Sequence, residues 1–119
     1  MGTSLNESGS GVTTDSSGNI YLTGTTKGGL DGNNSSGESD IILLKFDSSG
    51  TKQWTKQLGT SSVDLGNGVT TDSSGNIYVT GDTPIGLDGN ANSGGISCYI
   101  RASCKDIFLI KFNSSGTKQ

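Results

Sequence analysis

Two sets of side chains in this sequence could do chemistry: a pair of cysteines, and the oxygens at alternate positions of two related loops. Cys98 and Cys104 are the two cysteines of the chain. A disulfide between them would close a short ring and stabilise the loop by restricting the unfolded chain. Such a bond requires an oxidising compartment. Two free thiols are the alternative, so the disulfide stands as a prediction.

The segment between the cysteines contains Tyr99, Ile100 and Arg101. Aromatic, aliphatic and guanidinium side chains are the types that anchor protein interfaces, and a constrained loop loses less entropy on binding. A binding loop, natural or grafted, is therefore one interpretation. The other is an insertion in a surface loop, which a fold tolerates at little cost.

The second set lies in the loop GLDGNNSSGESD (residues 29–40) and in its relative GLDGNANSGG (residues 86–95). Oxygen-bearing residues at alternate positions can converge on calcium, which takes six to eight oxygen ligands. The glycine at the sixth position and the acid at the twelfth, both typical of calcium loops, are missing. A plain polar connection is the alternative. The candidate ligands are Asp31, Asn33, Ser35, Asp88, Asn90 and Asn92.

Catalytic sets are mostly missing from the sequence. The chain contains no histidine, which excludes Ser-His-Asp and Cys-His pairs and the usual zinc sites. Asp15, Asp47 and Asp72 each open a DSSG segment, where aspartate accepts hydrogen bonds from the backbone of a turn. No spacing selects two carboxylates that would face a sugar. We therefore expect no enzyme activity and no cofactor, with calcium as the one possible ion.

The elements that must position these residues are marked by a repeat. The segment DSSGNIY at Asp15–Tyr21 returns letter for letter at Asp72–Tyr78, which is a period of 57 residues. Farther on, Asp40 matches Asp106, so nine residues are inserted in the second copy, at about 96–104, and they include both cysteines. A fixed period of this size indicates stacked structural units.

Short apolar runs separated by turns predict four strands in the first copy and three in the second. The run IILLKF places apolar residues on consecutive positions, so both of its faces should be covered by neighbouring sheets. Repeated four-stranded sheets of this kind are propeller blades. The predicted strands are residues 11–14, 19–26, 40–46, 51–59, 68–71, 76–83 and 106–112.

We therefore predict an all-β fold with two propeller blades per chain, each of four antiparallel strands, closed by oligomerisation. Residues 1–60 would form the first repeat and residues 61–119 the second, whose last strand is missing. Residues 1–10 are expected to be a connection between units. The segments DSSGNIYLTG and DIILLKFDSSGTKQW, with their second copies, resemble the bacterial SBBP β-propeller repeat family. The resemblance covers residues 11–119 without the insertion, and implies blades of exported or surface-associated bacterial proteins with no assigned activity.

Charge and length limit the possible partners. The net charge is −3 and the sequence contains no cluster of Lys or Arg, which argues against nucleic acid. The apolar runs are too short to span a bilayer. The first residues lack the features of a signal peptide, so the chain is either cytoplasmic or a piece of a larger exported protein given a starting Met.

Two repeats seldom close a core alone, so the chain itself is the first expected partner, in a homo-oligomer of three or four copies. The function expected is a non-enzymatic structural and interaction module that presents loops. One alternative is a carbohydrate- or calcium-binding propeller. The other is an inhibitor or receptor binder that uses the Cys98–Cys104 loop.

Overall fold

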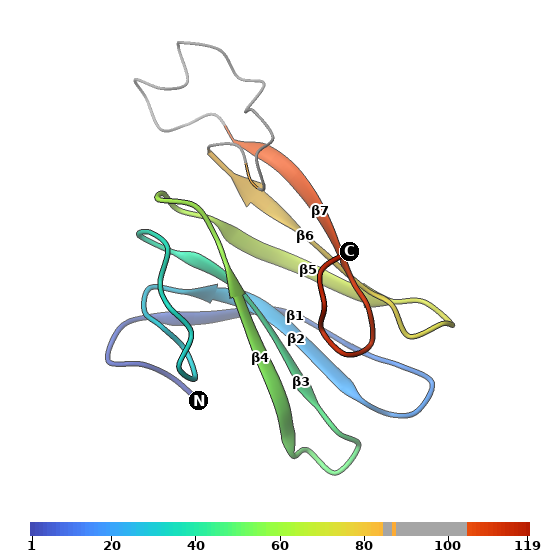
Figure 1. Cartoon of the computed structure of the whole chain (residues 1–119). Helices are drawn as coiled ribbons and strands as arrows, with labels where there is room; N and C mark the ends of the chain where they lie inside the picture. Colours follow the sequence, from blue (N-terminus) through green and yellow to red (C-terminus); the bar gives the residue numbers. More distant parts are fainter. Residues whose placement is uncertain (85–86, 88–104) are drawn as a thin grey trace.

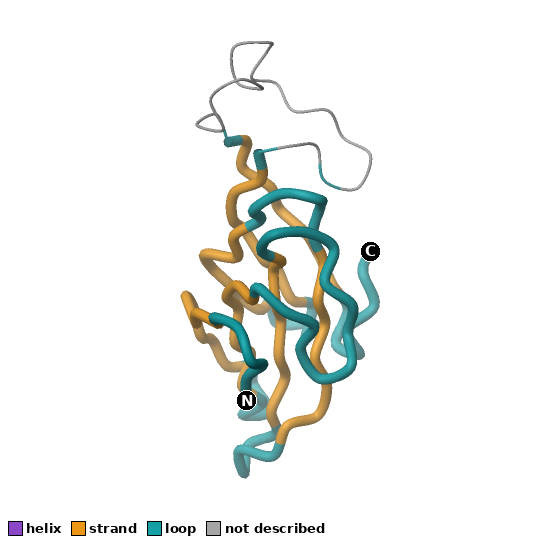
Figure 2. Tube along the Cα trace, turned by 90° about the vertical axis from the view of Figure 1, so that its left-hand side faces the viewer, coloured by secondary structure: helices purple, strands orange, loops and turns teal. Residues whose placement is uncertain are grey.

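The computed structural model describes residues 1–84, 87 and 105–119. These residues form strands joined by loops and turns, with no helix among them (Figure 2). Two antiparallel sheets result, one with the strand order β1-β2-β3-β4 and one with the order β5-β6-β7 (Figure 1). The strands are β1 (Glu7–Thr14), β2 (Ile20–Thr26), β3 (Asp40–Phe46), β4 (Lys52–Leu58), β5 (Leu65–Thr71), β6 (Ile77–Thr83) and β7 (Asp106–Phe112).

The predicted strands are all confirmed, but two of them begin earlier than expected. β1 begins at Glu7 and pairs Glu7 with Thr26 and Gly9 with Gly24, before the register shifts ahead of Gly11. The prediction that residues 1–10 only connect units was therefore wrong for Glu7–Ser10. Glycine and serine have low β-propensity, and a bulge interrupts the alternation on which the prediction rested. β5 likewise begins at residue 65 and has the equivalent shift.

The strand β3 is buried on both faces, as its sequence predicted. Ile41 and Leu43 point to one side and are fully covered, with 0 % exposed surface. Ile42 and Leu44 point to the other side, where Leu30 of the preceding loop packs against them. The cover on the first side comes from the second sheet, through Val69, Ile77, Val79, Phe108, Ile110 and Phe112. The two sheets therefore share one apolar core.

The second sheet lies against the first mainly through β5, which contacts β1, β2 and β3 (Figure 1). The hydroxyl of Thr71 donates a hydrogen bond to the carbonyl oxygen of Thr14 at 3.0 Å. These two threonines are equivalent positions of the repeat, one unit apart. The sheets are thus stacked with their turns at corresponding ends.

Four tight turns close the hairpins at one end of the stack. In each, the N–H of a glycine donates to the carbonyl oxygen three residues earlier, and that glycine has φ between 81° and 85°, a region that other residues rarely adopt. The turns are Asp15–Gly18, Asp47–Gly50, Asp72–Gly75 and Asn113–Gly116. The prediction that the repeated aspartates serve turns is confirmed.

The Asp72 carboxylate is saturated by its own turn. Its Oδ1 accepts the backbone N–H groups of Ser74 and Asn76, and its Oδ2 accepts the Asn76 amide and the Tyr78 hydroxyl, each at 2.9 Å. The side-chain amide of Asn76 contributes most to lowering the pKa of Asp72, to about 2. Asp15 makes the same bonds with Asn19 and Tyr21. In that turn, the pKa of the Tyr21 hydroxyl is raised to about 12. Burial is the main cause, and the hydrogen bond to Asp15 is the next largest.

The turn at Asn113 has a neutral asparagine where the other three turns have an aspartate, so this turn forms without a negative charge. Its Oδ1 accepts the backbone N–H and hydroxyl of Ser115 and the N–H of Thr117. Asp47 accepts the same three bonds within its own turn, and only Gln53 Nε2 bonds to its other oxygen. In the turns of Asp15 and Asp72, a tyrosine hydroxyl also donates to the carboxylate. The Oδ2 atom therefore accepts two hydrogen bonds in those two turns, and only there.

We predict that Asp72→Asn lowers the melting temperature by a few degrees, because an amide N–H₂ would face two donors that then lose their acceptor. The matched change Asp47→Asn should have little effect. Since the pKa of Asp72 is lowered in the fold, its stabilisation is present above about pH 4 and is lost as the pH falls through about 2. Thermal melts from pH 7 to pH 2 check both points. Equal losses in the two variants would contradict this account of the turns.

Candidate functional site

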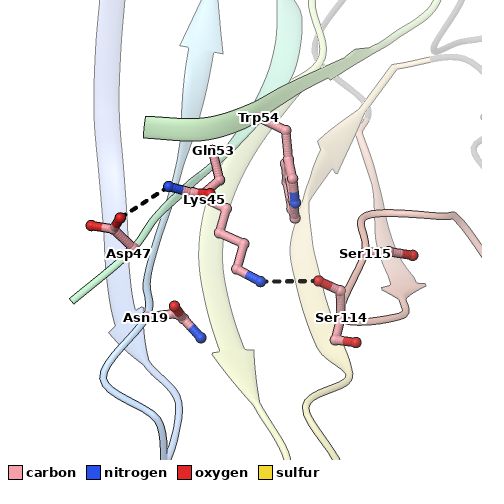
Figure 3. Close-up of a pocket in the computed structure, with 7 residues that line it drawn as sticks. All are labelled: Asn19, Lys45, Asp47, Gln53, Trp54, Ser114 and Ser115. Atoms are coloured by element: carbon pink, nitrogen blue, oxygen red, sulfur yellow. Dashed lines mark hydrogen bonds between the residues drawn. The ribbon is translucent and has the colours of Figure 1, made fainter. Parts of the chain in front are cut away.

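A polar cleft opens at the turn end of the stack, where the two sheets meet (Figure 3). Its volume is about 410 Å³. The first sheet supplies most of the wall, and the Asn113–Gly116 turn supplies the rest. The residues that line it are Asn19, Lys45, Asp47, Gln53, Trp54, Ser114 and Ser115.

Lys45 joins the two walls of the cleft. Its ammonium group donates a hydrogen bond to the carbonyl oxygen of Ser114 at 3.2 Å (Figure 3). It also lies 5.6 Å from the centre of the Tyr21 ring, a distance at which a cation is attracted to the ring face. Lys45 therefore fixes the second sheet's turn against the first sheet.

Trp54 forms the apolar part of the cleft. Its ring lies 6.3 Å from that of Tyr21, tilted by 52°, and the Lys56 ammonium lies 5.9 Å from its centre. Gly116 of the second sheet packs so closely that a Cβ there would lie 3.1 Å from the indole. The chain contains one tryptophan, and it stands at the junction of the two sheets.

The polar groups of the cleft can form hydrogen bonds with a ligand. Asn19 donates its amide N–H₂ to Asp15, which leaves its carbonyl oxygen as an acceptor. Gln53 donates to Asp47 at 3.1 Å (Figure 3). The Ser49 hydroxyl contributes most to lowering the pKa of Asp47, so this carboxylate is ionised at neutral pH. An ionised carboxylate cannot act as a general acid, but it can accept a proton or a hydrogen bond from a ligand.

Two sheet faces form a second candidate site, since neither is covered by another sheet in the described chain. On the outer face of the first sheet, a hollow of about 180 Å³ is lined by Leu22, Leu30, Ile42 and Leu44, with Met1 at its wall. Val12, which pairs with Leu22, is 66 % exposed on the same face. We call this surface the first outer face.

The second outer face is the side of the second sheet that points away from the first. Ile107 is 85 % exposed and Leu109 is 71 % exposed. These residues occupy the positions of Ile41 and Leu43 in the repeat, which are fully buried. The same strand face is therefore covered in one copy and bare in the other.

The structure places three of the six predicted calcium ligands, and each has another partner. Asp31 forms an ion pair with Lys52 at 2.7 Å, which is the main cause of its lowered pKa. Asn33 donates its amide to the carbonyl oxygen of Leu30 at 2.8 Å, and the Ser35 hydroxyl donates to that of Gly37 at 3.1 Å. No group of three His, Cys, Asp or Glu side chains gathers anywhere in the described residues.

The remaining predicted site residues lie outside the described part of the chain. These are the second set of candidate calcium ligands, the two cysteines and the three residues of the predicted binding loop. The disulfide, the loop and the calcium site all stay predictions. The residues concerned are Asp88, Asn90, Asn92, Cys98, Tyr99, Ile100, Arg101 and Cys104.

The cleft itself could not be predicted from the sequence pattern. Lys45 and Ser114 are 69 positions apart, and no local pattern links them. The available signal was the repeat, which makes Ser114 the equivalent of Ser48 in the first DSSG turn. Stacking two units side by side brings the turn of one next to the lysine of the other.

Comparisons with known proteins agree with this architecture. No curated protein matches the chain. No helix in the described residues is long and apolar enough to cross a membrane. A family described as a β-propeller repeat, SBBP, matches residues 2–31 and 53–88, which together make up more than half of the sequence. With two such repeats, folded as stacked antiparallel sheets, the chain belongs to the SBBP β-propeller repeat family.

Proposed function

We propose that the chain is a non-enzymatic interaction module that assembles head to tail with copies of itself into a closed propeller ring. The observation that carries this proposal is the contrast between Ile41 and Leu43, which are fully buried, and their equivalents Ile107 and Leu109, which are largely exposed. An exposed apolar patch of this kind commonly marks an interaction surface.

The partner that fits the second outer face is the first outer face of another copy. Inside the chain, Ile41 and Leu43 are covered by Val69, Val79 and Ile110 among others. The residues of the first sheet that correspond to this cover are Val12, Leu22 and Leu44, and they lie on the first outer face. A second copy would therefore repeat, between chains, the contact that already exists within one chain.

The resulting interface is heterologous, because each copy contributes a different face. Such contacts close into rings when the rotation between copies allows it. Propellers contain about four to eight blades, so two blades per chain favour three or four copies. The loops at both ends of the blades would then be displayed around the ring.

We predict that Leu109→Glu and Val12→Glu each abolish assembly when purified separately. Each change places a charge in the apolar contact, and losing one buried aliphatic side chain alone should weaken an interface about tenfold to a hundredfold. Mixing the two variants should restore a one-to-one complex, because one retains the first outer face and the other retains the second. Light scattering at micromolar concentration measures all three masses.

Two results would reject the proposal. The unmodified chain could remain a monomer at micromolar concentration. Alternatively, only one of the two changes could prevent assembly, which would indicate that identical faces meet. Circular dichroism of each variant serves as the folding control, since both side chains are exposed in the single chain.

A second candidate function is saccharide binding in the cleft, and Trp54 is the observation that favours it. An indole beside amide, ammonium and hydroxyl groups combines an apolar contact with several hydrogen-bonding partners, as small-ligand sites do. Asn19, Gln53 and Lys45 would bond to the hydroxyl groups of a sugar. The residues that line this cleft do not belong to the loop of residues 29–40, on which the carbohydrate alternative from the sequence rested.

We predict that a saccharide of the right class changes the fluorescence of Trp54, which is the one tryptophan of the chain. A panel of methyl hexosides and N-acetylhexosaminides is the probe. Gln53→Ala should weaken the response about two- to tenfold, as expected for the loss of one hydrogen bond. Asn34→Ala removes an exposed amide that does not line the cleft and is the matched control. An unchanged emission across the panel would argue against this candidate.

A further inference from the structure

Two fully buried aspartates lie at the junction of the sheets, at the end opposite the tight turns. Asp40 is the first residue of β3, and Asp64 immediately precedes β5. Both have 0 % exposed surface. Their backbones belong to one connected network, because the N–H of Asp64 donates to the carbonyl oxygen of Ser39 at 2.9 Å and the N–H of Ser39 donates to that of Ser62.

Each carboxylate has one oxygen that is well supplied with donors. Asp40 Oδ2 accepts the backbone N–H of Ser36 at 2.7 Å and the side-chain amide of Gln57 at 2.9 Å. Asp64 Oδ2 accepts the hydroxyl of Thr60 at 2.8 Å and also its backbone N–H. These bonds hold both side chains in fixed positions.

The other oxygen of each carboxylate has no hydrogen-bond partner in the described chain, although it is buried. The two side chains also approach the same point, which is Gly59. A Cβ on this glycine would overlap Asp40 Oδ1 and would lie 3.1 Å from Asp64 Oδ2. The glycine therefore leaves room for the unpartnered Oδ1 of Asp40, and the Asp64 oxygen nearest to it is Oδ2, which accepts from Thr60. The two carboxyl groups thus lie close to one point, from opposite sheets.

Buried carboxylates with unsatisfied oxygens need positive charge nearby to replace lost hydration. The ion pair of the described residues joins Lys52 to Asp31, and neither residue is a partner of Asp40 or Asp64. Oxygen-only donors favour hard cations, and calcium accepts carboxylates together with carbonyl oxygens and water. A hard cation such as calcium would therefore supply the positive charge that the two carboxylates need.

We propose that Asp40 and Asp64 bind a calcium ion between the two sheets, through the oxygens that have no donor among the described residues. Asp40 is the last residue of the loop of residues 29–40, but this site uses none of the ligands predicted there, Asp31, Asn33 and Ser35. Because its two ligands come from different sheets, the ion would tie the blades together at the end where the turns do not.

The test is calcium binding and calcium-dependent stability of the full chain. Equilibrium dialysis of the unmodified protein with calcium should give at least one bound ion per chain. Saturation at about a hundred times the dissociation constant should raise the melting temperature by roughly 10 °C over the protein in EDTA. Asp40→Asn and Asp64→Asn should each remove this rise, while Asp31→Asn should keep it.

The dialysis result does not depend on whether the variants fold, so it can refute the proposal alone. No bound calcium in the unmodified chain would overturn it. A rise in melting temperature that survives in both junction variants would also overturn it, as would a rise that disappears only with Asp31→Asn. Magnesium in place of calcium distinguishes the two hard cations, and a larger effect of magnesium would reject calcium as the ion.

Discussion

A strand that carries apolar side chains to both faces is stable only between two covering layers, and β3 imposes this requirement on the chain. Its residues Ile41, Ile42, Leu43 and Leu44 are all buried. Burying four such side chains stabilises a fold by on the order of 10 kcal/mol, which is comparable to the whole net stability of a small domain. The second sheet is therefore part of the core of the first. The contact between blades decides whether either blade is stable.

The strands could be predicted from the sequence because apolar alternation and the repeat describe local, periodic properties. The same reasoning failed at Glu7–Ser10, where glycine and serine form a strand whose pairing is set by its neighbour and interrupted by a bulge. It also missed the cleft around Lys45 and Trp54. That site forms where two stacked units meet, and the spacing of residues within one unit does not predict it. The loop around Asp31 shows the converse, since its oxygens match a ligand pattern but bond to other groups of the chain.

Aspartate serves two different purposes at the two ends of the stack. At the turn end, Asp15 and Asp72 are saturated by donors of their own hairpins, and the stabilisation remains local. At the other end, Asp40 and Asp64 come from different sheets, and each has an oxygen without a donor in the part of the chain that the structure describes. Saturated carboxylates stabilise a turn and have no capacity left for a ligand. A carboxylate with an unpartnered oxygen among the described residues can still accept a further donor or a cation.

The match between Ile41 and Ile107, each on the same face of its own blade, also bears on how such proteins change over generations. Unequal recombination between copies of the repeat would add or remove one unit of 57 residues. Every junction in the product would still be made by the same positions, because each unit carries both the covering face and the covered one. The number of blades could therefore change in a lineage before any new contact between residues had evolved. Selection would then act first on the size of the ring and only later on individual residues.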